Sequence, residues 1–292
     1  MTYQIPRLFP TNNHNNLVIC IQGEGVSKEF STLMANIIPD LGLIGSNQCF
    51  PLYWYEERKG TQGSLFDDGK DRYIRHDAVT DFILKRAREQ YGPKVTKEDI
   101  FYYVYGFLHC PSYRETFAND LKKMLPRLPL VEKSEDFWAF SKAGRDLAEL
   151  HLNYEKVPAT KEVVVDWHNM LPGLADNDTP EKLYRVEQMR FARSANGGKE
   201  KDKSVIEYNP FITLRHIPLR AYDYVVNGKS AIEWVMERYC DKVDKKSGIH
   251  NDANQWGIEH GNPRYPLDLL QSIITLSLRT LDIVDSLPKI TF

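Results

Sequence analysis

Apolar and polar residues follow different patterns along the chain, and the first quarter has the pattern of strands and turns. Leu17–Gln22 is a short, β-branched apolar run that ends beside two glycines, which is typical of a buried strand. Leu41–Tyr55 is apolar and aromatic, and Gly45 and Pro51 interrupt it, so it predicts two short strands around a turn. The polar stretch Glu56–His76 that follows predicts an exposed loop.

The middle of the chain has helical periodicity. The predicted helices are Val79–Tyr91, Lys97–Leu108, Ser112–Met124 and Phe137–Tyr154. Thr96 followed by Asp99 predicts an N-cap for the second of them. That helix has aromatic residues on all sides, in IFYYVYGFL, and a helix of this kind is expected in the core rather than as a platform for stacking bases.

The second half predicts strands followed by helices. The predicted strands are Lys182–Phe191, Ser204–Tyr208 and Ile212–Ile217, and Arg193–Lys203 forms a hairpin tip or loop between the first two. A helix follows at Ser230–Tyr239, then a polar turn region at Lys242–Asn262, and finally a long helix at Pro266–Ser286, whose leucines and isoleucines recur every three or four residues.

These elements predict an α+β fold. It has a β-rich N-terminal part, a central helical cluster, a region that contains a β-hairpin, and a long C-terminal helix. The composition changes after Glu155, where prolines become frequent. We therefore divide the chain into residues 1–160 and 161–292, with one continuous domain as the alternative.

The net charge is close to zero, which limits how a nucleic acid could be bound. Among 292 residues, 38 are Lys or Arg and 40 are Asp or Glu, so the formal net charge is −2. This balance excludes a wholly basic coat protein but allows a basic face. A hydrophobic fraction of 42% and an aromatic fraction of 12% are typical of a folded globular protein rather than a disordered one.

The cysteines and the apolar segments indicate a cytoplasmic protein. Cys20, Cys49, Cys110 and Cys240 are far apart, and no two of them form a CxxC pair, so we expect buried, reduced thiols and no zinc site. The first residues lack the apolar segment of a signal peptide. No apolar run approaches the roughly 18 residues that a membrane-spanning helix needs.

The sequence lacks the motifs of the common catalytic sites. It has no GxxxxGK[ST] loop for a nucleoside triphosphate, and the Gly-Glu-Gly at residues 23–25 lacks the third glycine of a dinucleotide-binding loop. The Asn-Pro-Phe at residues 209–211 faintly resembles the Asn-Pro-Pro-aromatic loop of amino-methyltransferases, but without the second proline we interpret it as a β-turn. The histidines and acidic residues show no catalytic or metal-ligand spacing. We therefore predict no catalytic residue and no metal site.

Basic and amide side chains cluster in a few predicted loops. One cluster consists of Lys182, Arg185, Arg190, Arg193, Lys199, Lys201 and Lys203. A hairpin with Gly-Gly at its tip and lysines beside it could reach DNA phosphates, and a solvated loop is the alternative. Polar side chains also occur in the loop and turn at residues 46–48 and 58–75. Arg, Lys, Asn and Gln are the side chains that read base edges in the major groove.

Five long blocks of sequence follow one another: IPDLGLIGSNQCFPLYWYEE (38–57), DIFYYVYGFLHCPSYRETFANDLKKMLPRLPL (99–130), DFWAFSKAGRDLAELHLNYE (136–155), AYDYVVNGKSAIEWVMERY (221–239) and NPRYPLDLLQSIITLSLRTLDIVDSLP (262–288). These blocks resemble the C-terminal specificity region of type ISP restriction–modification enzymes, in the same order. The resemblance extends from about Pro6 to Pro288.

The resemblance implies a function in DNA target recognition. Members of that family are large polypeptides with a nuclease, a helicase-like translocase, an adenine methyltransferase and a target-recognition domain, and this chain resembles only the last. The implied partners are double-stranded DNA and the upstream methyltransferase and helicase domains. S-adenosylmethionine, ATP and Mg would bind only in those upstream domains, and this chain would hold no cofactor. We expect the chain to be a piece of a longer protein rather than the product of a separate specificity gene.

The candidate DNA contacts rest on side-chain chemistry and loop position, because the resemblance assigns no contact residues. They are Asn47, Gln48, Arg58, Lys59, Gln62, Arg190, Arg193, Lys199, Lys201, Lys203, Asn254 and Gln255. Two alternatives remain open: a stand-alone fragment with methyltransferase or nuclease activity, and a protein-interaction scaffold without a DNA role.

Overall fold

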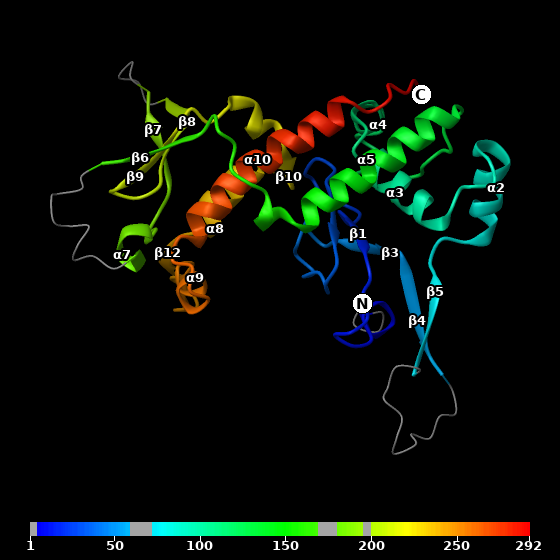
Figure 1. Cartoon of the computed structure of the whole chain (residues 1–292), viewed down its shortest axis with the longest axis horizontal. Coiled ribbons are helices and arrows are strands. Elements are labelled where there is room, and N and C mark those ends of the chain that lie inside the picture. Colours follow the sequence, from blue (N-terminus) through cyan, green and yellow to red (C-terminus); the bar gives the residue numbers. More distant parts are fainter. Residues whose placement is uncertain (1–4, 59–71, 169–179, 195–199) are drawn as a thin grey trace. The chain divides into compact units, whose positions relative to one another are not determined.

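The structure is a computed structural model that describes residues 5–58, 72–168, 180–194 and 200–292. It contains two compact units (Figure 1). Unit 1 consists of residues 1–152 and 283–292, and unit 2 of residues 153–282. The first unit thus ends somewhat before the boundary at residue 160 that the composition suggests, and the last ten residues return to it.

Unit 1 combines short strands with a helical cluster. Its elements are α1 (Ile5–Leu8), β1 (Val18–Ile21), β2 (Thr32–Ala35), β3 (Gln48–Pro51), β4 (Tyr53–Glu57), β5 (Tyr73–Asp77), α2 (Asp81–Tyr91), α3 (Lys97–Phe107), α4 (Pro111–Thr116) and α5 (Ser134–Leu152). Strands β2, β1 and β3 form an antiparallel sheet in that order, and β4 and β5 form a separate antiparallel pair.

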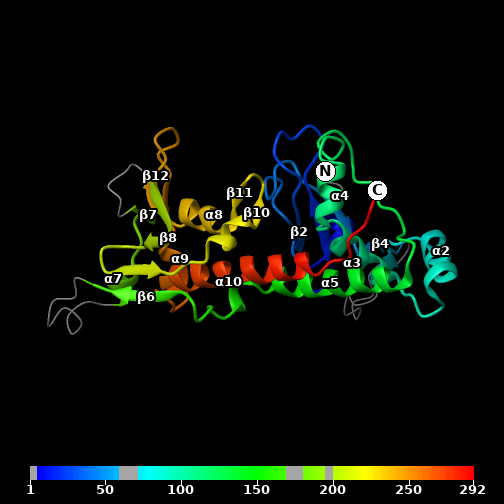
Figure 2. The same ribbon diagram turned by 90° about the horizontal axis from the view of Figure 1, so that it is seen from above.

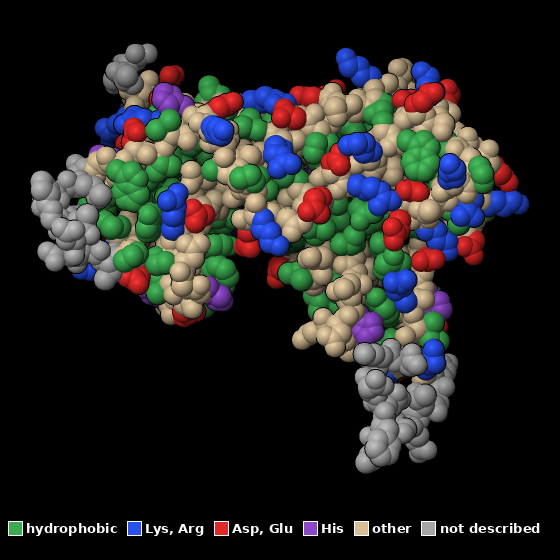
Figure 3. All heavy atoms as spheres, in the orientation of Figure 1, with side chains coloured by type: hydrophobic (Ala, Val, Ile, Leu, Met, Phe, Trp, Pro, Cys, Tyr) green, Lys and Arg blue, Asp and Glu red, His purple; other side chains and the backbone are tan. Residues whose placement is uncertain are grey.

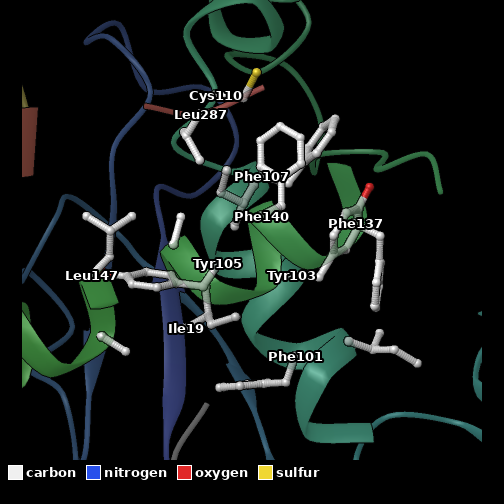
Figure 4. Packing of buried hydrophobic residues seen from close by; sticks show 14 of the residues in the cluster. Ile19, Phe101, Tyr103, Tyr105, Phe107, Cys110, Phe137, Phe140, Leu147 and Leu287 are labelled. Atoms are coloured by element: carbon white, nitrogen blue, oxygen red, sulfur yellow. The ribbon is translucent and has the colours of Figure 1, made fainter. Parts of the chain in front are cut away.

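The core of unit 1 is built around the aromatic helix α3 and its neighbour α5 (Figure 4). Tyr103 of α3 stacks on Phe137 of α5 with ring centroids 5.0 Å apart, and Phe107 lies 5.0 Å from Phe140. Ile19 of the buried strand β1 belongs to the same cluster. The aromatic side chains of α3 therefore lie in the core or pack against it, as the pattern predicts.

Local sequence signals set the start of α3. The backbone N–H of Asp99 donates to the Thr96 hydroxyl, and the Asp99 carboxylate accepts from the backbone N–H of Thr96 at 2.9 Å. This reciprocal pair satisfies two donors that a helix N-terminus otherwise leaves unpaired. It is the cap that the sequence predicts for this helix.

Unit 2 contains a four-stranded sheet and two longer helices. Its elements are η1 (Tyr154–Lys156), β6 (Val164–Trp167), α7 (Pro180–Tyr184), β7 (Arg190–Arg193), β8 (Lys201–Glu207), β9 (Ile212–Arg215), η2 (Leu219–Asp223), β10 (Val225–Val226), β11 (Lys229–Ser230), α8 (Ala231–Arg238), β12 (Asp241–Val243), β13 (His250–Asp252), α9 (Gln255–Glu259) and α10 (Tyr265–Asp285), whose last residues belong to unit 1. The sheet is antiparallel, in the order β6-β9-β8-β7.

One face of this sheet carries the core of unit 2. Ile206 of β8 and Leu214 of β9 are fully buried, and they belong to one cluster with Ile232 of α8 and with Leu270 and Ile274 of α10. The two helices therefore bury that face, and apolar burial of this kind is the main stabilising contribution to such a unit.

The α+β fold class is confirmed, and so is the long C-terminal helix. Four local predictions were wrong. The predicted polar turn region Lys242–Asn262 contains most of β12, all of β13 and α9. The stretch Lys182–Phe191 is not one strand, because α7 ends at Tyr184 and β7 begins only at Arg190. The expected loop Glu56–His76 instead has a strand at each end, and the expected helix Ser112–Met124 ends at Thr116. Short strands form where a partner strand supplies hydrogen bonds, which the local pattern does not reveal.

Candidate nucleic-acid interface

The antiparallel β7–β8 ribbon brings together three of the predicted cations. Arg190 and Arg193 lie at the two ends of β7, and Lys201 begins β8. Arg193 and Lys201 are directly opposite each other in the register, and both side chains are exposed. Like charges in that arrangement destabilise a sheet, so the pair is unfavourable for folding by itself. An anion bound from outside would neutralise both charges.

Hydrogen bonds close the ribbon beyond this pair. The backbone N–H of Ser194 donates to the carbonyl of Glu200 at 3.0 Å. The register shifts between Phe191 and Ala192, whose partners on β8 are Ile206 and Asp202, so the ladder is interrupted at this point. The predicted hairpin is therefore present on both sides of its tip, whereas Lys199 at the tip lies outside the described residues.

The face of the sheet opposite the core is open and polar. Arg190, Glu207, Thr213 and Asp166 are paired across the four strands in one row, so their side chains share that face. The face forms a groove of about 680 Å³. Its lining also includes Trp167, His168, Glu187, Gln188 and Arg215.

The groove carries both hydrogen-bond donors and acceptors. Arg190 donates from Nη2 to Oε1 of Gln188 at 3.0 Å, and Arg215 donates from Nε to Oδ2 of Asp166 at 2.5 Å. Alternating guanidinium and carboxylate groups do not produce the single-sign field of a phosphate site. Arg, Gln and carboxylates are, however, the groups that pair with guanine, adenine and cytosine edges in the major groove.

Charges of both signs are mixed on the visible face of the molecule (Figure 3). On the face that Figure 3 shows, Lys and Arg side chains are interspersed with Asp and Glu side chains. This mixture agrees with the formal net charge of −2. Any contact with a polyanion therefore depends on a few local groups of cations.

Lys203, a fourth predicted cation, is engaged in folding contacts. Its ammonium group lies 3.2 Å from Oε1 of Glu233 and sits over the rings of Phe191 and Tyr222. Burial would raise the pKa of Glu233, but hydrogen bonds from Ser230 and Lys203 outweigh this effect and lower it. The carboxylate thus stays ionised beside Lys203, which leaves this lysine poorly placed for DNA.

Asn254 and Gln255, which the sequence suggests as base contacts, are also used internally. Asn254 is 2% exposed, accepts from the backbone N–H of Val186 at 2.9 Å and donates to the carbonyl of Val186 at 2.9 Å. Gln255 is exposed and donates to Glu259 at 2.8 Å on the next turn of α9. Asn254 therefore holds two segments of unit 2 together, and we do not retain it as a DNA contact.

The remaining predicted contacts belong to unit 1. Asn47 is 3% exposed and its amide nitrogen lies 3.5 Å from Sγ of Cys49, while Gln48 is half-buried at the start of β3. Arg58 is exposed just after β4, and its backbone N–H donates to the carbonyl of Arg72. Lys59 and Gln62 lie outside the described residues. Asn47 is too buried for a base contact, and Arg58 keeps an accessible guanidinium group.

Two groove residues, Gln188 and Arg215, were missed by sequence reasoning. Arg215 is the exposed end of a strand whose other residues are buried, and this contrast is the signal that could have indicated it. Gln188 lies between α7 and β7 and has no such signal. The predicted turn at residues 209–211 is present, because the Asn209 side chain accepts from the N–H groups of Phe211 and Ile212.

The described residues show neither a metal-binding cluster nor a membrane-spanning helix. In the ranges that the structure covers, no three His, Cys, Asp or Glu side chains converge as metal ligands. No helix in those ranges combines the length and the apolar character needed to cross a bilayer. The four cysteines are unpaired thiols, of which Cys49 is partly exposed and the other three are buried.

Comparison with known proteins identifies relatives over the whole chain. Residues 1–269 match the family model of the type ISP C-terminal specificity domain. The ATP-dependent type ISP restriction–modification enzyme LlaBIII bound to DNA is 34% identical, with a TM-score of 0.81 over 100% of this chain. A nuclease-deletion mutant of the type ISP enzyme LlaGI, in complex with a DNA substrate mimic, is 36% identical, with a TM-score of 0.74 over 98%.

A third structure, a DrdV–DNA complex, is 30% identical, with a TM-score of 0.77 over 100% of this chain. The chain spans 17%, 22% and 26% of the LlaBIII, LlaGI and DrdV chains, respectively. A search of curated proteins finds no significant match. From the family model and these three structures, the chain belongs to the family of type ISP C-terminal specificity domains.

Proposed function

We propose that this chain recognises a specific sequence in double-stranded DNA. The observation that carries the proposal is the similarity, over essentially its whole length, to three proteins whose structures contain DNA or a DNA substrate mimic. The TM-scores of 0.74 to 0.81 apply to the fold of this chain as a whole, not to a short motif.

The β7–β8 ribbon and the open sheet face are suited to the two parts of such recognition. A two-stranded ribbon fits into the major groove. Arg193 and Lys201 at its free end would contact phosphates and set the register, whereas Arg190 and Gln188 would face base edges. Phosphate contacts alone carry no sequence information, so the specificity would come from the groove.

The rest of the proposed activity would reside in other domains of a longer polypeptide. An adenine methyltransferase, a translocase and a nuclease would act on the site that this chain selects, in the cytoplasm. S-adenosylmethionine, ATP and Mg would bind in those domains. The chain would make no covalent change to the DNA, and its contribution would be to hold the target in a fixed position.

The test is selection from a pool of random duplexes, followed by binding measurements. We expect a short sequence to be enriched and to bind about 10³-fold or more tightly than a scrambled duplex at the same salt concentration. No enrichment, with equal binding of all duplexes, would refute sequence recognition by this chain. Binding of S-adenosylmethionine in equilibrium dialysis would instead indicate a methyltransferase fragment.

A further inference from the structure

A second hairpin in unit 2, formed by β12 and β13, carries an unassigned surface. The sequence predicts only a polar turn region here, but Asp241, Lys242 and Val243 pair in antiparallel register with Asp252, Asn251 and His250. In Figure 2 the hairpin (orange) projects from the body of unit 2. Every residue from 242 to 251 is exposed.

The base of this hairpin is firmly braced. Asp241 and Asp252 face each other across the strands, and one nitrogen of Arg185 binds both carboxylates, with 2.9 Å to Asp252. The backbone N–H of Asp241 donates to the carbonyl of Glu187 at 2.9 Å. Two hydrogen bonds between the Asn254 side chain and the Val186 backbone attach the residues that follow β13 to the same segment. The hairpin is therefore held in place by the segment that leads into β7.

The tip carries three lysines and one carboxylate. Asp244 is the single acidic residue from 242 to 251, and its carboxylate accepts from the N–H groups of Lys246 and Ser247 and from the Ser247 hydroxyl. These hydrogen bonds lower the pKa of Asp244. In the part of the chain that the structure describes, Lys242, Lys245 and Lys246 are exposed and form no salt bridge. The charge of Lys242 also helps to lower the pKa of Asp244.

Apolar side chains stand beside these lysines. Val243 is 58% exposed and Ile249 is 66% exposed. Aliphatic side chains in this position do not contribute to the core of unit 2. They are placed for contact with a partner that offers both negative charge and apolar surface.

We propose that the β12–β13 hairpin is a second DNA-contacting arm. It would bind phosphates through Lys242, Lys245 and Lys246, and pack Val243 and Ile249 against sugars or thymine methyl groups. Duplex DNA is the partner because the hairpin is fastened to Arg185 and Glu187, directly before the proposed reading groove, and Glu187 itself lines that groove. The inference rests on the proposed DNA-binding function.

The test replaces all three lysines by alanine and measures duplex binding by fluorescence anisotropy at several salt concentrations. Log affinity falls as log salt rises, and each lost phosphate contact makes this negative slope shallower by about 0.9. Three contacts change the slope by about 2.7, so raising salt from about 50 to about 200 mM weakens wild-type binding about 40-fold more than binding by the variant. Selected and scrambled duplexes should be affected equally, because phosphate contacts carry no sequence information.

A matched control removes three exposed lysines elsewhere, Lys28, Lys94 and Lys133, and should keep the wild-type slope. A second variant, Val243→Ser with Ile249→Ser, should weaken binding without changing the salt slope. Thermal unfolding of each variant checks that it is folded.

The outcomes separate this inference from the proposed function. If the triple lysine variant keeps wild-type affinity and slope while Arg193→Ala with Lys201→Ala weakens binding, the arm is overturned and the DNA-binding function stands. If the wild-type chain binds no duplex, the proposed function fails, and the arm fails with it. If the wild-type chain binds vesicles of phosphatidylserine and phosphatidylcholine, and the triple lysine variant loses this binding but keeps its DNA binding, the hairpin contacts a membrane surface instead.

Discussion

Helices α3 and α5 approach each other through two glycines, and Gly144→Ala should therefore destabilise unit 1. A Cβ atom placed on Gly144 would lie 1.9 Å from the carbonyl oxygen of Tyr102 and 2.9 Å from the backbone nitrogen of Gly106. A Cβ atom on Gly106 would lie 2.1 Å from the carbonyl oxygen of Phe140. These neighbours are backbone atoms of packed helices, so no flexible side chain can move aside.

Two opposing effects determine the size of the change. Alanine in a helix interior is about 1 kcal/mol more favourable than glycine. Overpacking of a well-packed core costs about 1–3 kcal/mol, and here two helices rich in buried aromatic residues would have to separate by more than about 1 Å. Taking the upper end of that range, we expect Gly144→Ala to lower the free energy of unfolding by about 2 kcal/mol.

The assay is urea-induced unfolding followed by circular dichroism. The matched control is Ala139→Gly, which lies on the exposed side of the same helix and reports the helix propensity alone. It should lower the free energy of unfolding by about 1 kcal/mol. If Gly144→Ala instead stabilises the chain by about that amount, the close approach of the two helices is wrong.

Three further predictions concern the pH dependence, the thiols and a helix cap. Burial, with a contribution from Arg114, lowers the pKa of His151 to about 3. The ring's contribution to stability is therefore complete above about pH 6.5 and is lost as the pH falls toward 3. Between pH 7 and 5 the free energy of unfolding should drop by about 2 kcal/mol from this ring, and an unchanged slope in His151→Gln would contradict this. Hydrogen bonding from Cys20 lowers the pKa of Cys49 to about 7, whereas the same hydrogen bond and burial raise the pKa of Cys20. Iodoacetamide near pH 7 should therefore label Cys49 first, and peptide mass mapping measures this order. Thr96→Ala removes the cap of α3 and should cost about 1 kcal/mol in thermal or urea unfolding, and no loss would mean that the cap is not formed in solution.

Some of the site could be anticipated from the sequence, because it depends on residues close together in the chain. The β7–β8 hairpin follows from two apolar runs separated by a polar, glycine-containing segment, and the cations on it were predicted one by one. Their relation was not predicted. Only the register places Arg193 directly opposite Lys201, and this arrangement is what makes the pair a candidate phosphate site.

Tertiary structure reversed the interpretation of several polar residues. Asn254 and Lys203 have the side-chain chemistry of DNA contacts, but Asn254 is buried against Val186 and Lys203 is paired with Glu233. Arg185 counted as one more cation of a basic cluster, yet it braces the second hairpin. A side chain's type defines which bonds it can form, whereas its neighbours in space decide whether those bonds are already made.

By itself, the sequence determined the elements whose stability is local: the capped aromatic helix α3, the long helix α10 and the turn at Asn209. Their hydrogen bonds join residues a few positions apart, so the local pattern is sufficient. Only the tertiary structure decided the short strands β5, β12 and β13, the return of the last residues to unit 1 and the open face of the sheet. Short strands obtain their hydrogen bonds from other segments of the chain, and the exposure of a sheet face depends on which helices cover the other one.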